Sequence, residues 1–178
     1  MNSGYLEGYL EKTCMKAALV FITWIYISLI VETTWCVFCG PSLLHLDLIP
    51  ALICWYALND RLSRGTLWVI GAGFLASLFS SLKFFLFPFS YLTAFLTVYF
   101  IRSNVLELTR FHAYLITAFI SVEILVIQLA GSGNPELLWP WGLIQAGLNM
   151  AVAPVVFWIC DRSLFILSEI VSKFHHEK

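Results

Sequence analysis

The chain has 178 residues, of which 60% are apolar, 16% aromatic and only 12% charged. Average soluble domains are roughly 45 to 50% apolar and about 25% charged, so this composition excludes a water-soluble globule, whose surface needs more polar side chains. It equally excludes a disordered chain. The net charge of −1 gives no basic field for the phosphates of nucleic acid, which excludes nucleic-acid binding. The composition therefore predicts a protein whose main solvent is lipid.

Six apolar runs, separated by polar residues or by Pro and Gly, are candidates for membrane-spanning helices. A span needs about 20 residues at 1.5 Å rise each. With their flanking turns, the expected spans cover residues 17–38, 44–60, 64–82, 86–101, 111–130 and 138–160. The weakest break, between the third and fourth runs, depends on Lys83 and on Pro88, because proline suits the first turn of a new helix. The sequence thus predicts an all-α integral membrane protein, a six-transmembrane-helix bundle that forms a single domain over residues 1–178.

The basic residues indicate how these six helices are threaded, because short cytoplasmic loops retain Lys and Arg. With the N-terminus inside, only Lys83 of the 10 basic residues lies on the outer side. The inner side holds Lys12, Lys16, Arg61, Arg64, Arg102, Arg110, Arg162, Lys173 and Lys178. A single crossing over residues 66–101 removes this asymmetry, since every later basic residue then moves outside. We therefore expect six spans with both termini in the cytoplasm.

Most polar residues within the expected spans fall in the outer half of the membrane by helical rise. They are Glu32, Asp47, Glu123, Gln145 and Asn149. Such groups are costly in lipid, so each is a functional candidate until its partner is found. Two interpretations stay open: the residues bond to one another and to Lys83 between helices, or they line an outward-facing groove for a ligand or partner helix. Glu123 is the strongest indication of a groove, because no basic residue is expected at its depth.

Small residues mark the places where helices are expected to approach closely. Gly73, Ser77 and Ser80 share one stripe of the third helix, and Ala146 and Ala153 share one stripe of the sixth. Small side chains let two helix backbones come together, so both stripes are predicted packing faces. We expect this packing within the bundle, with contact to another subunit as the alternative.

Cys36 and Cys39 have the Cys-x-x-Cys spacing of a redox pair and lie at the expected outer end of the first helix, where a disulfide can form. Their spacing and place resemble the DsbB family of membrane disulfide oxidases, which implies a thiol oxidoreductase. That family relays electrons through a second outer pair, whereas Cys14 and Cys160 are expected to be cytoplasmic here and Cys54 intramembrane. Two small buried side chains are therefore the favoured interpretation. No other catalytic, cofactor-binding or metal-binding pattern is found, so neither enzymatic activity nor a cofactor is expected.

Three stretches of the chain resemble segments of one known protein family. Residues 46–52 read Leu-Asp-Leu-Ile-Pro-Ala-Leu and are followed by an aromatic pair and a basic turn; residues 71–78 read Gly-Ala-Gly-Phe-Leu-Ala-Ser-Leu; and residues 148–157 contain an Asn and a Pro. Over residues 43–165 the chain resembles the MreD family of rod-shape-determining proteins. The resemblance implies a non-enzymatic inner-membrane subunit of the bacterial cell-elongation machinery.

Such a subunit would bind an MreC-like membrane protein by helix packing and through its polar outer half, with Glu123 and Asn149 as candidate contacts. Through that partner it would communicate with MreB and with the peptidoglycan-synthesis pair, a SEDS glycosyltransferase and a penicillin-binding protein. A weaker resemblance is to the S components of energy-coupling-factor vitamin transporters, which also have six helices and bind a substrate. Those proteins dock through an Ala-x-x-x-Ala stripe in the first helix, which residues 17–38 lack. A closed cavity with convergent polar groups would favour this alternative.

Overall fold

The computed structural model describes the backbone of residues 3–39, 47–79, 85–105, 109–132 and 141–176. Within these ranges it contains six helices and no strand, so the predicted all-α fold is confirmed. The helices are α1 (Ser3–Cys39), α2 (Ile49–Asn59), α3 (Leu62–Leu78), α4 (Leu86–Asn104), α5 (Arg110–Ser132) and α6 (Trp141–His176).

Three of the described helices are long and apolar enough to cross a membrane. These stretches are Met15–Thr34 of α1, Arg110–Gly131 of α5 and Leu143–Ile170 of α6, whereas α2 and α3 are apolar but shorter. Large apolar side chains such as Leu67 and Trp158 point away from the protein and are mostly exposed. The many large apolar side chains that the described residues expose suit lipid rather than water. The chain is therefore a membrane protein.

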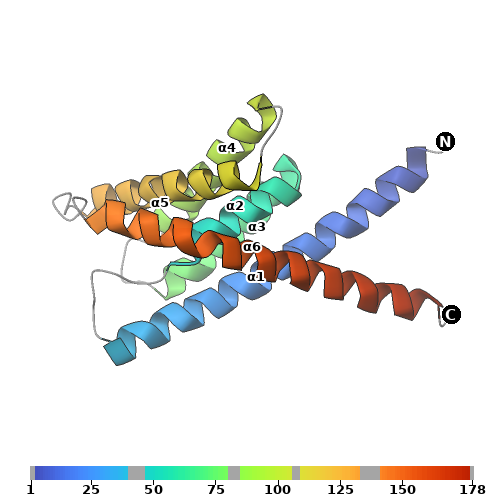
Figure 1. Ribbon diagram of the computed structural model, residues 1–178, viewed down its shortest axis with the longest axis horizontal. Coiled ribbons are helices and arrows are strands. Elements are labelled where there is room, and N and C mark those ends of the chain that lie inside the picture. Colours follow the sequence, from blue (N-terminus) through green and yellow to red (C-terminus); the bar gives the residue numbers. More distant parts are fainter. Residues whose placement is uncertain (1–2, 40–46, 80–84, 106–108, 133–140, 177–178) are drawn as a thin grey trace.

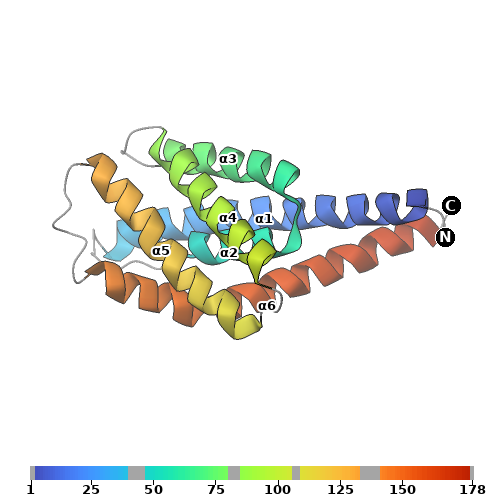
Figure 2. The ribbon, with the colours of Figure 1, turned by 90° about the horizontal axis from the view of Figure 1, so that it is seen from above.

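The six helices pack as a bundle around α2, with α3 along one side of it and α6 along the other in Figure 2. α3 packs mainly against α4 and α5 mainly against α6, and in Figure 2 α4 and α5 run obliquely across the front of α1 and α2. α4 also packs against α5, which closes the bundle. α2 lies at the centre, packs against each of the other five helices, and buries all of residues 49–57.

Local sequence explains where α2 and α4 begin. The carboxylate of Asp47 accepts a hydrogen bond from the backbone N–H of Ile49 at 3.0 Å, and Pro50 lies in the first turn of α2. Pro88 lies in the first turn of α4, where the sequence places it. Pro154 lies inside α6 without ending it, which neighbouring helices of a bundle make tolerable.

The two terminal helices extend well beyond the expected spans. α1 begins at Ser3 rather than near residue 17, and α6 continues to His176 rather than ending near residue 160. Neither additional segment contains a proline, so nothing breaks the helix there. In Figure 1, α1 and α6 cross and then splay apart toward the end of the molecule where both termini lie. α2, in contrast, begins only at Ile49, not near residue 44.

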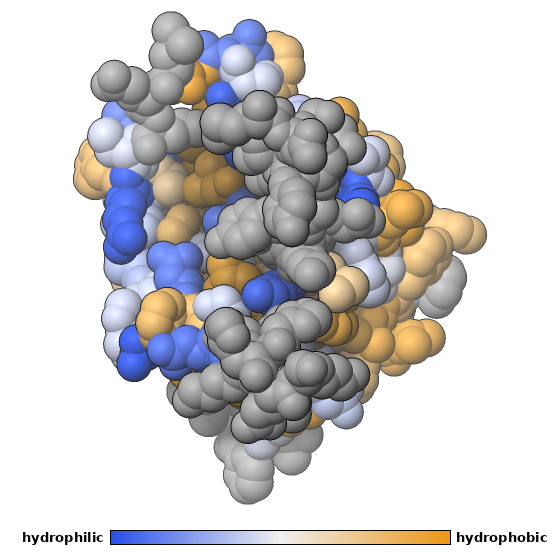
Figure 3. All heavy atoms as spheres, turned by 90° about the vertical axis from the view of Figure 1, so that its right-hand side faces the viewer, coloured by the Kyte–Doolittle hydropathy of each residue, from blue (hydrophilic) through white to orange (hydrophobic). Residues whose placement is uncertain are grey.

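The two ends of the bundle differ in charge. Arg61, Arg64, Arg102 and Arg110 lie at the end where α2 and α4 finish and α3 and α5 start, hereafter the basic end. Figure 3 views this end and shows hydrophilic residues gathered on it, while hydrophobic residues cover one flank. The other end, where α2 and α4 begin, is hereafter the opposite end.

A row of aromatic rings joins α1, α2 and α4 near the basic end. Phe21 stacks on Tyr56 with ring centroids 4.2 Å apart and planes inclined by 12°. Tyr56 lies 6.3 Å from Phe95, which in turn stacks on Tyr99 at 6.5 Å. Each such pair adds about 0.5 to 1.5 kcal/mol beyond the burial of its area. The row therefore fixes the position of α2 between its neighbours.

Candidate functional site

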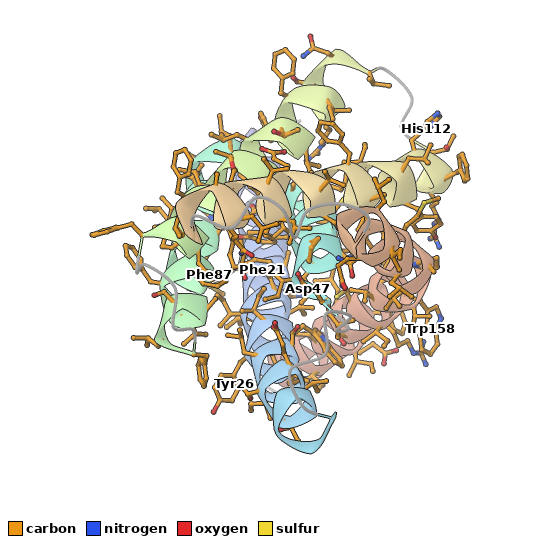
Figure 4. The ribbon with its side chains drawn as sticks, turned by 90° about the vertical axis from the view of Figure 1, so that its left-hand side faces the viewer. Phe21, Tyr26, Asp47, Phe87, His112 and Trp158 are labelled. Carbon is orange, nitrogen blue, oxygen red and sulfur yellow. The ribbon has the colours of Figure 1, made fainter. Side chains whose placement is uncertain are left out.

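Glu32 of α1 and Asp47, which precedes α2, lie together at the opposite end of the bundle. Their carboxylates are close enough to repel each other, and both lie near Tyr91 of α4. Figure 4 views this end and shows Asp47 near the middle of the bundle. Lys83, the expected partner of these acids, lies outside the described residues. The structure thus places these two predicted polar site residues close to each other.

Gln145 and Asn149 form a chain of hydrogen bonds that joins α6 to α5. The side-chain N–H of Gln145 donates to the Oδ1 of Asn149 at 3.0 Å, and the amide of Asn149 donates to the hydroxyl of Ser121 at 3.1 Å. Ser121 in turn donates to the carbonyl of Thr117 at 2.7 Å. Asn149 is only 2% exposed. Asn149 therefore faces α5, and both amides are buried inside the bundle.

Glu123 faces α4 from α5. Its Oε1 accepts a hydrogen bond from the hydroxyl of Thr97 at 3.2 Å. Its Oε2 is buried and accepts no hydrogen bond from the described residues. The contacts described above place the five predicted polar residues in three sets: the two acids beside Tyr91, the amide chain, and Glu123 with Thr97.

α3 packs closely on α4 through the small residues of its predicted stripe. A Cβ added to Gly73 would lie 2.4 Å from the Cα of Pro88, and one added to Gly65 would lie 2.2 Å from the ring of Phe95. Ser77 is buried on the same side of the helix. At Gly73 the backbone of α4 occupies the space of a side chain, whereas at Gly65 the ring of Phe95 occupies it.

The other predicted packing and cysteine residues divide into two sets. Ala146 and Ala153 are buried in α6, at 5% and 0% exposure. Ser80 lies outside the described residues, as do the side chains of Cys36 and Cys39 at the end of α1. A disulfide between these two cysteines therefore stays a prediction.

An apolar groove, which the sequence did not indicate, separates α1 from α6 on the side of the basic end. It has a volume of about 490 Å³. Its walls are Leu19, Val20, Thr23, Trp24 and Ile27 of α1 and Ser163, Ile166, Leu167 and Ile170 of α6. The indole N–H of Trp24 donates to the hydroxyl of Ser163 at 3.1 Å and ties the two helices together there. One feature of the sequence could have indicated this groove: the apolar pattern of α6 continues past residue 160.

Asp161 of α6 is a residue at the basic end that sequence reasoning missed. Its Oδ1 accepts a hydrogen bond from the indole N–H of the buried Trp55 at 2.8 Å, and its Oδ2 lies 3.9 Å from the Nη2 of Arg110. Because the arginine is mostly exposed, this ion pair contributes little to stability, whereas the bond to Trp55 fixes α6 against α2.

Arg102 and Asp60 close the end of α2. The Nη1 of Arg102 donates to the backbone carbonyls of Ala57 and Asp60 at 2.9 and 3.2 Å, two acceptors that the end of a helix leaves unpaired. The carboxylate of Asp60, which is 3% exposed, accepts bonds from the Tyr56 hydroxyl and from the backbone N–H of Arg61. Beside these groups lies a second cavity of about 190 Å³.

Comparisons with family models, with curated proteins and with solved structures find no match for this chain. The two amides at the opposite end are bonded within the bundle, whereas the apolar groove and the basic-end cavity are open surfaces.

Proposed function

We propose that the chain is a non-enzymatic subunit of the bacterial cell-elongation complex, similar to MreD, that binds an MreC-like protein in the inner membrane by helix packing. The likeness of residues 46–52, 71–78 and 148–157 to that family supports the proposal. Through the MreC-like protein, the chain would communicate with MreB and with the SEDS glycosyltransferase and its penicillin-binding partner.

The apolar groove between α1 and α6 is the observation that carries this proposal. It lies between two helices long enough to cross a membrane, and apolar residues dominate its walls from Leu19 to Ile27 and from Ile166 to Ile170. Association of helices in lipid depends on close packing of side chains, so a concave apolar surface between two helices suits a third. The occupant that we propose is a transmembrane helix of the MreC-like protein.

The proposed topology has six spans with both termini in the cytoplasm. The four arginines of the basic end then lie inside the cell, as the positive-inside rule requires. A reporter enzyme that is active only outside the cell, fused after Arg110, should be inactive. Activity of that reporter would place the basic end outside and would contradict the topology.

Co-purification with an MreC-like protein from the same cell tests the proposed function. Thr23 lines the groove and is exposed, and its hydroxyl bonds only to the carbonyl of Leu19 one turn earlier at 2.8 Å, so Thr23→Trp fills the groove at little cost to folding. We expect wild-type protein to capture the partner and Thr23→Trp to capture at least tenfold less, since a tenfold change corresponds to about 1.4 kcal/mol.

Leu67→Trp is the matched control for this experiment. Leu67 lies on α3, away from the groove, and is 71% exposed. This variant adds the same indole to a lipid-facing position and should capture the partner as well as the wild type does. Capture that survives Thr23→Trp would contradict docking in the groove, and no capture by intact, membrane-extracted wild-type protein would contradict the proposed function.

The two alternative functions have less support. A substrate-binding S component requires polar groups that converge on a cavity, yet neither cavity described above is lined by Glu32, Asp47, Glu123, Gln145 or Asn149. The DsbB family, which the Cys36-x-x-Cys39 spacing resembles, relays electrons through a second cysteine pair. Cys54 and Cys160 are both buried and free.

A further inference from the structure

The cavity at the basic end has the size and the lining of a site for one small anionic group. Its volume is about 190 Å³, below the roughly 300 Å³ at which pockets for drug-sized molecules begin. It lies where the turn between α2 and α3 meets the last turn of α4. Its lining residues are Asp60, Arg61, Tyr99, Arg102 and Ser103.

Two guanidinium groups at this cavity retain unused hydrogen-bond donors. Arg102 uses only its Nη1, which donates to the two carbonyls at the end of α2 and so holds the side chain in place. Its Nε and Nη2 have no partner among the described residues. The guanidinium of Arg61 is exposed and likewise bonds to none of the described residues. Each guanidinium can therefore offer its planar fork to a phosphate.

Asp60 does not neutralise these two cations by direct pairing. Both of its carboxylate oxygens are occupied, one by the hydroxyl of Tyr56 and the other by the backbone N–H of Arg61 at 2.7 Å. Among the described residues, neither Arg61 nor Arg102 forms an ion pair with it. Two positive charges against one negative charge leave the cavity with a net charge of +1.

The start of α3 adds to this positive potential. Arg61 is the N-cap of α3, and no side chain caps this helix terminus. The first backbone N–H groups of a helix lack intrahelical acceptors, and its N-terminus carries roughly half a positive charge. Tyr99 adds a hydroxyl that has no hydrogen-bond partner among the described residues.

We propose that this cavity binds a phosphate group between Arg61 and Arg102, and that an anionic phospholipid at the basic end supplies it. Because the site lies at one end of the bundle and its neighbours α3 and α4 present apolar side chains outward, a lipid can place its headgroup there while its chains stay in the bilayer. This inference is independent of the identity of any protein partner.

Lipid titration of the purified full-length chain in a neutral detergent tests the proposal, with binding followed by native mass spectrometry or by the shift of the melting temperature. The probes are phosphatidylglycerol, zwitterionic phosphatidylcholine and inorganic phosphate, all at one ionic strength. We expect phosphatidylglycerol to bind at least tenfold more tightly than phosphatidylcholine. Arg61→Gln should weaken phosphatidylglycerol binding about tenfold, since it removes a charge-assisted bidentate contact.

Arg64→Gln is the matched control, because Arg64 lies at the same end and is exposed but does not line the cavity. Arg64→Gln removes one positive charge, as Arg61→Gln does, but it should weaken the binding of phosphatidylglycerol less than twofold. Arg61→Lys, which keeps the charge but loses the fork, should fall between the two. Tighter saturation by inorganic phosphate than by the lipid would assign the site to free phosphate. Equal losses for Arg61→Gln and Arg64→Gln, or equal binding of both lipids, would overturn the site.

Discussion

Two helix–helix interfaces, each called a seam below, differ in how closely the helices approach. One lies between α3 and α4, and the other lies between α1 and α6. Gly65 and Gly73 bring α3 so close to α4 that neither position has room for a methyl group. α1 and α6 instead meet through large side chains such as Trp24, and they leave a groove beside the contact. Because lipid gives no hydrophobic drive for helices to associate, side-chain size at the seam sets how closely they pack. The first seam is complete, and the second leaves surface for another helix.

Gly73→Ala tests the close packing of α3 on α4 and should have the largest effect on stability. The new Cβ would meet the backbone of Pro88 at 2.4 Å, and backbone at the start of a helix cannot move aside as a flexible side chain can. We expect the free energy of unfolding to fall by about 2 to 3 kcal/mol, toward the upper part of the range for overpacking. Denaturation of the detergent-solubilised protein by a graded content of sodium dodecyl sulfate measures this change.

Gly71→Ala is the control for that variant on the same helix. A Cβ at Gly71 meets nothing within 4 Å, and alanine has the higher helix propensity. This variant should be neutral or should stabilise the protein by up to about 1 kcal/mol. Equal destabilisation by both variants would show that α3 does not depend on close contact with α4.

Gly65→Ala should have a smaller effect, because its new methyl group meets a side chain rather than the backbone. The obstacle is the ring of Phe95, which is fully buried and therefore moves only at a cost. We expect a loss of about 1 to 2 kcal/mol. The double variant Gly65→Ala with Phe95→Leu should be less destabilised than the sum of the two single changes. Strict additivity would contradict the contact.

Asn149→Ala tests the seam between α5 and α6, which is joined by polar groups rather than by glycine. It removes the bonds to Ser121 and Gln145. Hydrogen bonds between membrane helices contribute about 0.6 kcal/mol on average and about 1.7 at most, so we expect a loss of about 1 kcal/mol. Leu148→Ala, one residue away and 39% exposed, should change the same measurement less. A larger loss for Leu148→Ala would contradict the assigned role of the amide chain.

Trp24→Phe should have the smallest effect on stability. It removes only the bond from the indole to Ser163, at a seam that is already partly open. We expect a loss of about 0.5 kcal/mol. A double-mutant cycle with Ser163→Ala isolates this bond. A coupling energy above about 1.5 kcal/mol would show that this bond contributes strongly to the packing of α1 on α6. It would contradict the description of this interface as partly open.

The six helices and the close face of α3 follow from patterns within short stretches of sequence. Apolar runs and the position of Pro88 locate the helices, and the spacing of Gly73 and Ser77 places both on one side of α3. Likewise, the four-residue spacing of Gln145 and Asn149 puts the two amides one turn apart, within reach of each other.

What the sequence did not reveal depends on how distant helices cross. The bond between Trp55 and Asp161 joins residues 106 positions apart, and the groove exists only because α1 and α6 splay. The extensions of these two helices were missed because a search for apolar spans stops at the first charges, here Lys16 and Asp161. Helix formation continues through charged residues that leave the backbone hydrogen bonds intact.

The burial of α2 has a consequence for how the protein is made. Its 11 residues reach about 16 Å, roughly half the thickness of a hydrocarbon core. Its first turn is held by Asp47, and its last carbonyls are bonded by Arg102, which leaves the ribosome 45 residues after Ala57. A helix this short gains little free energy when it enters the bilayer on its own. We therefore expect α2 to settle in the membrane only after α4 has been synthesised, so that insertion of the first four helices is a single cooperative step of biogenesis.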